Sequence, residues 1–200
     1  MKKIYVFCDA CVLEFFHEKG KGKKITGKSK KRKAVVVSGG AFQYNNPESN
    51  KVFKHSFCFN KSVIKSSSAE EKTILKALNY IDKFVTMPFN IIIHTDQKDL
   101  VDYLNKKNEK IYQKENENYE SIIEEILKFE EIKKHKINLI WVPSTSKSSD
   151  FMKGRTAFNV LHNEMDELAY GTTQKQFKEQ IKFFQKNIKN VKKSKKIKNY

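Results

Sequence analysis

The stretch Ile4-Tyr5-Val6-Phe7-Cys8-Asp9 decides the fold, because it is an apolar run that leads directly into a carboxylate. Its side chains alternate between two faces, which is typical of a buried strand. Residues 34–44 form a second apolar run, residues 52–59 alternate as a third, and Asn45-Asn46-Pro47 supplies the turn between them. The chain therefore opens with a predicted meander of three antiparallel strands.

The period of the apolar residues changes after residue 65. Ile74, Leu78 and Ile81 share one helical face behind the serines at 66–68, which are good helix caps. Residues 90–94 and 137–142 are predicted as strands, with helices near 100–104, 119–127 and 159–170. This order predicts an α/β domain in which helices flank a five-stranded mixed sheet, the meander plus parallel strands. Trp141, on the fifth strand, is expected in the core.

Acidic residues stand where several of these elements begin or end. Asp9 closes the first predicted strand, Asp96 follows the fourth, and Glu70 lies near the start of the first helix. Neighbouring strands lie about 4.8 Å apart, so parallel pairing of strands one and four would bring Asp9 and Asp96 close together. Two such carboxylates repel one another unless a proton or a cation neutralises them. The pattern predicts a site for a hard cation such as Mg²⁺.

The formal net charge of +17 over 200 residues is concentrated in two segments. Residues 19–33 and residues 172–200 each carry a net charge of +9, which leaves the rest of the chain near −1. Clustered positive charge attracts polyanions, so we expect nucleic acid as the partner. The alternative is that these are a solubilising loop and tail.

Several classes are excluded or disfavoured by composition. No stretch approaches the roughly 18 uncharged apolar residues of a membrane span, so no membrane partner is expected. The first residues are too quickly interrupted for a signal peptide, and three cysteines do not form a disulfide framework. We therefore expect a cytoplasmic protein with reduced thiols.

Five segments resemble, in order, the motifs of the type 1 branch of the ribonuclease H superfamily. They are residues 4–11, 69–71, 93–97, 139–143 and 163–169. The resemblance implies a ribonuclease H-like three-layer catalytic domain over residues 1–171, with a basic loop at 19–33 and an inserted loop at 144–158. Residues 172–200 follow as a basic amphipathic helix, which either docks on its own domain or binds a protein partner.

The resemblance also implies an activity and a site. It implies an endonuclease that hydrolyses the RNA strand of RNA/DNA hybrids with two Mg²⁺ ions, for which Mn²⁺ can substitute. Four carboxylates match the catalytic and metal-binding motifs: Asp9, Glu70, Asp96 and Asp166. Asp9 would bridge the two ions, Glu70 and Asp96 would complete one metal site, and Asp166 would complete the other.

This chain departs from the family pattern after the fifth strand. A Gly-His pair that helps proton transfer in many members is replaced here by Ser144-Thr145. His162, one helical turn before Asp166, either substitutes for the missing histidine or is a packing residue.

Candidate nucleic-acid contacts come mainly from the basic loop. They are Lys23, Lys24, Lys30, Lys31, Arg32 and Lys33, together with Gln97 after the fourth strand. Two alternatives to a hybrid nuclease remain open. The first is a DNA-cutting or resolvase-like nuclease of the same superfamily, and the second is a non-catalytic module that binds nucleic acid or docks on a partner.

Overall fold

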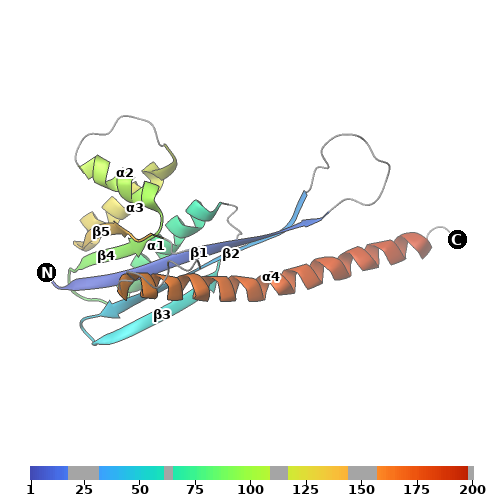
Figure 1. The fold of residues 1–200 in the computed structure, drawn as a ribbon, viewed down its shortest axis with the longest axis horizontal. Coiled ribbons are helices and arrows are strands. Elements are labelled where there is room, and N and C mark those ends of the chain that lie inside the picture. The colour runs from blue at the N-terminus through green and yellow to red at the C-terminus, as the bar shows by residue number, and fades with distance from the viewer. Residues whose placement is uncertain (18–31, 61–64, 109–116, 144–156, 198–200) are drawn as a thin grey trace, which may run out of the picture.

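A mixed β-sheet forms the centre of the protein (Figure 1). The computed structural model describes residues 1–17, 32–60, 65–108, 117–143 and 157–197. The strands lie in the order β3-β2-β1-β4-β5. Their bounds are β1 Lys3–His17, β2 Arg32–Asn46, β3 Lys51–Cys58, β4 Asn90–Thr95 and β5 Lys136–Trp141. β1, β2 and β3 form the antiparallel meander, and β1, β4 and β5 are parallel. The predicted five-stranded mixed sheet is confirmed.

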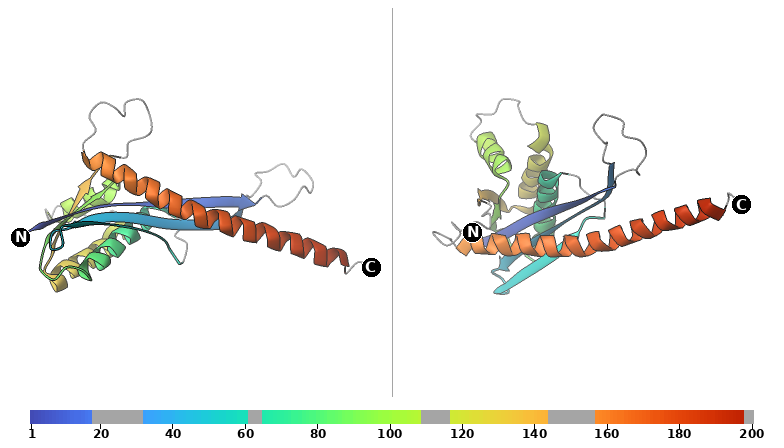
Figure 2. Two further views of the ribbon diagram at one scale, coloured as in Figure 1. Left: turned by 90° about the horizontal axis from the view of Figure 1, so that it is seen from below. Right: turned by 45° about the vertical axis from the view of Figure 1, so that its right-hand side comes forward.

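Helices cover both faces of the sheet, which gives three layers (Figures 1 and 2). Their bounds are α1 Ser66–Asp82, α2 Lys98–Asn108, α3 Glu117–Lys133 and α4 Ala157–Ile197. The larger core lies between the sheet and α1, α2 and α3, where Ile4 and Val6 of β1 meet Leu78, Leu100 and Ile123. A smaller core lies on the opposite face, between the sheet and α4.

The hairpin of β1 and β2 is longer than expected. The first strand was predicted to end at Asp9, but β1 continues to His17, so Asp9 lies in the middle of the strand. The cause is the partner strand: β4 pairs with β1 only from Lys3 to Phe7, whereas β2 stays paired as far as His17. Beyond β4 the hairpin projects away from the body (Figure 1).

The last helix is also longer than expected. Two helices were predicted, one ending at Tyr170 and a basic amphipathic one over residues 172–200, but they form the single helix α4, which runs unbroken through Gly171 to Ile197. Past Gly171 the helix packs on the projecting hairpin, where the rings of Phe15 and Phe184 meet edge to face with centroids 6.3 Å apart. This part of α4 therefore docks on its own domain. The last turns of α4 extend beyond the hairpin (Figures 1 and 2). None of the helices in the described ranges is long and apolar enough to cross a membrane.

Trp141 is not a core residue, contrary to expectation. It is 42% exposed, and the Lys98 ammonium lies 5.3 Å from the centre of its ring. β5 is an edge strand, so its last residues pack against one neighbouring strand only.

Two adjacent glycines of β2 let helices approach both faces of the sheet. A Cβ on Gly39 would lie 2.5 Å from the Thr173 hydroxyl oxygen of α4. A Cβ on Gly40 would lie 2.1 Å from the Thr73 hydroxyl oxygen of α1. Because neighbouring residues of a strand face opposite sides, this pair sets the spacing of both helix layers at one point.

Gly40→Ala should lower the free energy of unfolding by about 1–3 kcal/mol, because the new methyl group overpacks the contact with buried Thr73. Urea unfolding followed by circular dichroism measures this. Gly171→Ala is the matched control, because nothing lies within 4 Å of its Cβ position. That change should stabilise α4 by up to about 1 kcal/mol. Equal effects of the two changes would contradict the packing argument.

Candidate metal centre

Three of the four predicted carboxylates converge near the carboxyl end of β4. Asp9 comes from the middle of β1, Asp96 follows the last residue of β4, and Glu70 lies one turn into α1. One carboxylate oxygen from each lies within 4.8 Å of the other two. The parallel pairing of β1 with β4 places the two aspartates, and α1, which packs on β1 and β2, brings Glu70 close to them.

Asp9 pays an electrostatic penalty for this position. Its side chain is buried, and burial followed by the charge of Asp96 raises the pKa of Asp9 to about 8. The backbone N–H of Ala10 donates a hydrogen bond of 2.6 Å to Asp9 Oδ1, which acts in the opposite direction and lowers the pKa. At neutral pH the Asp9 carboxylate therefore holds a proton or needs a cation beside it.

The pKa of Glu70 is raised for the same reasons as that of Asp9. Burial and the charge of Asp96 raise its pKa to about 8, while the Ser66 hydroxyl, which donates to Glu70 Oε1 over 3.2 Å, lowers it. The serines at 66–68 were predicted as caps, but the N-cap is Lys65, which makes no side-chain cap bond. The spacing of four residues between Ser66 and Glu70 is the sequence signal for their contact.

The donor set fits a hard divalent cation. All three groups offer carboxylate oxygens, which are the ligands that Mg²⁺ prefers in proteins. A cation among them would stabilise the ionised forms that burial and mutual repulsion disfavour.

Asp166 lies close to this cluster but outside the set of mutually close oxygens. It is an exposed residue of α4, and its negative charge contributes to the raised pKa of Asp9. Its predicted role as a metal ligand stays a prediction.

His162 lies beside the cluster, one turn before Asp166 on α4. It is 2% exposed, and its Nδ1 is 3.9 Å from Asp9 Oδ2. Its Nε2 has no hydrogen-bond partner among the described residues. Burial lowers the pKa of His162, while Asp96 and Asp166 raise it. The structure therefore places this histidine next to a candidate ligand, as its alternative role as a proton carrier requires.

The candidate nucleic-acid contacts are placed only in part. Lys23, Lys24, Lys30 and Lys31 lie outside the described residues, and Arg32 and Lys33 begin β2. Gln97 is a buried residue rather than a surface one. Burial raises the pKa of Glu71 and of Tyr119, and the nearby Gln97 amide acts in the opposite direction on both. A contact between Gln97 and nucleic acid stays a prediction.

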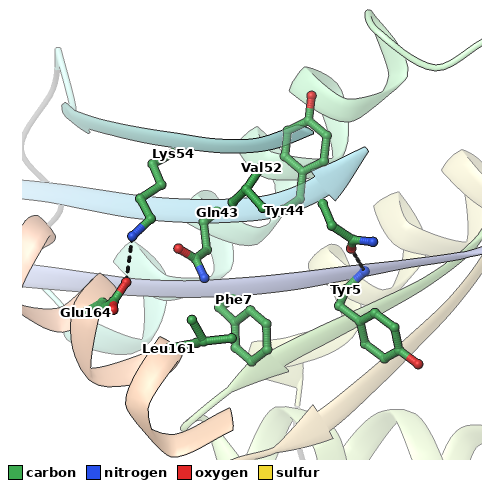
Figure 3. A pocket seen from close by; sticks show the side chains of 9 residues that line it. Tyr5, Phe7, Gln43, Tyr44, Val52, Lys54, Leu161 and Glu164 are labelled. Atoms are coloured by element: carbon green, nitrogen blue, oxygen red, sulfur yellow. Dashed lines mark hydrogen bonds and ion pairs between the residues drawn. The ribbon is translucent and has the colours of Figure 1, made fainter. Parts of the chain in front are cut away.

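A cavity of about 400 Å³ lies on the α4 side of the sheet (Figure 3). Tyr5 and Phe7 of β1 and Gln43 of β2 line it, and the 2.6 Å ion pair of Lys54 with Glu164 lies at its side. None of the three clustered carboxylates lines this cavity, so it is separate from the candidate metal centre.

Solved structures of other proteins have a fold similar to that of this chain. No family model matches the chain, and no curated protein matches its sequence. Among solved structures, LC11-RNase H1 in complex with an RNA/DNA hybrid aligns with 86% of this chain and 98% of its own, at a TM-score of 0.51 and 12% identity. RNase H1 from the halophilic archaeon Halobacterium salinarum NRC-1 aligns with 86% of this chain and 98% of its own, at 0.53 and 9%. The chain has a ribonuclease H-like fold.

A viral enzyme shares this ribonuclease H-like fold. The protease-reverse transcriptase of prototype foamy virus aligns with 85% of this chain over 20% of its own length, at a TM-score of 0.54 and 12% identity. At such identities the likeness concerns the fold, and it confirms the three-layer ribonuclease H-like architecture expected from the sequence motifs.

The raised pKa values predict that stability in the absence of metal falls as the pH rises. Asp9 and Glu70 have pKa values of about 8 in the folded chain and about 4 in the unfolded chain. Between these values the folded chain binds more protons, so the free energy of unfolding decreases with rising pH. Urea unfolding in EDTA at about pH 5 and about pH 8 measures this, and Mg²⁺ at about pH 8 should restore part of the loss.

Asp9→Asn should flatten this pH dependence and stabilise the metal-free chain at about pH 8 by about 1–3 kcal/mol, because it removes a buried charge without a partner. Asp102→Asn, an exposed change on α2, is the control and should leave the pH dependence intact. An Asp9→Asn protein whose stability falls as steeply as that of the parent chain would contradict the assignment.

Proposed function

We propose that the protein is a metal-dependent endonuclease that hydrolyses the RNA strand of RNA/DNA hybrids by a two-metal-ion mechanism. The observation that carries the proposal is the convergence of Asp9, Glu70 and Asp96 at the end of β4 in a ribonuclease H-like fold. The name of one structural neighbour supports the choice of substrate, since LC11-RNase H1 was solved with an RNA/DNA hybrid.

The metal ions would be held by the carboxylates already described. Asp9, Glu70 and Asp96 would hold one Mg²⁺, and Asp9 with Asp166 would hold a second, with Mn²⁺ as a substitute. When bound, such ions lower the pKa of a coordinated water and stabilise negative charge on the phosphodiester. The protein would bind and orient the ions by fixing these four carboxylates on separate parts of the fold.

His162 would carry the proton that the missing Gly-His pair handles in other family members. Its Nδ1 faces Asp9 across 3.9 Å, and its position on α4 is fixed because the side chain is buried. Because burial lowers its pKa, the neutral ring would be available to accept a proton at Nδ1 near neutral pH.

The test of the activity is cleavage of end-labelled substrates in Mg²⁺ or Mn²⁺, with EDTA as the metal-free control. The substrates are RNA/DNA hybrid, double-stranded RNA, double-stranded DNA and branched DNA. The proposal predicts metal-dependent loss of the RNA strand of the hybrid alone. Cleavage of DNA would place the chain with the DNA-cutting nucleases, and binding without cleavage would make it a binding module.

Asp96→Asn should reduce the rate of hybrid cleavage by at least about a hundredfold, because it removes one of the three carboxylates that would hold a Mg²⁺ ion. The single-turnover rate measures this, and Asp102→Asn on the exposed side of α2 is the matched control. Full activity of the Asp96→Asn protein would refute the proposed site.

His162→Ala should lower kcat by about 10²-fold or more with little change in KM, because a proton carrier acts in the transition state. Added imidazole should restore part of the rate if the ring carries a proton. A fall in stability without a change in kcat at saturating substrate would instead identify His162 as a packing residue.

A further inference from the structure

α4 carries a row of exposed lysines on its solvent side. They are Lys175, Lys178, Lys182 and Lys186, which we call the lysine stripe. Their spacings of three and four residues put them on one face of the helix. At a rise of 1.5 Å per residue the stripe is about 16 Å long. In the sequence, lysines continue at spacings of three and four residues at Lys189, Lys193 and Lys196. Residues 172–200 contain one acidic residue, Glu179.

The opposite side of α4 is anchored, which fixes the direction of the stripe. Phe177, Ile181 and Phe184 are half-buried, and Phe184 meets Phe15 of the projecting hairpin. One turn earlier Thr173 is fully buried beneath Gly39. Because the apolar side of the helix is packed on the hairpin, the lysines are held in solvent.

The tip of the projecting hairpin and the distal half of α4 lie at the same end of the molecule (Figures 1 and 2). The strands that flank residues 18–31 end at His17 and Arg32, at the tip of the projecting hairpin. The distal half of α4 extends in the same direction (Figures 1 and 2). Gathering like charges costs free energy, and a bound polyanion offsets that cost.

We propose that the lysine stripe binds the phosphate backbone of nucleic acid at a distance from the carboxylates. Lys186 lies 20 residues along α4 from Asp166, which is about 30 Å in a helix. Contacts of this type add affinity without choosing a sequence. The inference deepens the proposed function and rests on it for the choice of nucleic acid among polyanions.

An anionic membrane surface is the other polyanion that a basic helix can meet. Membrane-surface helices insert their apolar side between lipids, but here that side is packed on the hairpin. Among residues 172–188, one large apolar side chain is exposed to solvent, that of Phe183, which is 69% exposed. One such side chain gives a weak anchor, so the observations favour nucleic acid.

The test replaces all four stripe lysines by glutamine, which has a similar helix propensity. Binding of a labelled RNA/DNA hybrid of about 30 base pairs is measured by fluorescence anisotropy in EDTA, at salt concentrations from about 50 to about 300 mM. If each lysine contacts one phosphate, the slope of log affinity against log salt should become shallower by about 3 to 4. Affinity at about 0.1 M salt should fall at least about tenfold.

A matched variant controls for net charge. It replaces Lys2, Lys83, Lys128 and Lys136 by glutamine, four exposed lysines of the body, so its net charge changes equally. Its slope should stay close to that of the parent chain. A stripe variant with four arginines should keep the parent slope, and circular dichroism checks that each variant is folded. Equal slopes for the two glutamine variants would overturn the proposal.

Two further arms separate other interpretations. Single-stranded RNA and vesicles containing phosphatidylserine are measured beside the hybrid. Loss of vesicle binding with unchanged nucleic-acid binding in the stripe variant would overturn the proposal in favour of a membrane surface. Since binding is measured in EDTA, its result does not depend on cleavage. A chain that binds through the stripe but cuts no hybrid would refute the proposed activity and leave the stripe assignment intact.

Discussion

Repulsion among three carboxylates is the constraint on which this structure depends. The fold holds oxygens of Asp9, Glu70 and Asp96 within 4.8 Å of one another and buries Asp9 almost completely. Such an arrangement lowers stability unless protons or a cation compensate it. The rest of the molecule is the scaffold that keeps these groups together. Parallel strands β1 and β4 fix the aspartates, and α1, packed on β1 and β2, brings Glu70 to them.

β1 connects the two halves of the molecule. Its first residues pair with β4 and build the main core, and Asp9 follows at the point where β4 ends. Its distal residues pair with β2 alone and form a platform for α4. α4 in turn bears His162 beside the carboxylates and the lysine stripe further along. One strand and one helix thus link the candidate metal centre to the basic end of the chain.

The sequence predicted those features that depend on local pattern. Alternation identified the strands, and the expected parallel pairing of strands one and four correctly predicted that Asp9 and Asp96 lie close together. Glu70 followed from a family motif. Features set by tertiary partners were not predicted correctly. β1 extends past Asp9 because β2 remains its partner, and α4 continues through Gly171 because the hairpin supports it. Trp141 is exposed at the last residue of edge strand β5, although Ile137 and Leu139 of the same strand are buried.

The candidate site was also predictable only in part from the sequence. Three acids met as expected, because the parallel pairing of β1 with β4 places Asp9 beside Asp96 and α1 brings Glu70 to them. Asp166 and His162 lie on a helix that crosses the other face, and their distances from the cluster depend on how closely α4 packs. That packing depends on small side chains and on Gly39, which have no chemical signature of their own in a single sequence.

The central claim is that the carboxylate cluster is a metal site that holds protons when no metal is bound. Titration calorimetry with Mg²⁺ near pH 7, repeated in buffers of different ionisation enthalpy, tests it most directly, because it counts protons released on binding. The account predicts saturable Mg²⁺ binding that releases about one to two protons, since Asp9 and Glu70 have pKa values of about 8, and loss of this signal in Asp9→Asn. Absence of Mg²⁺ binding, or binding with no proton release, would contradict it.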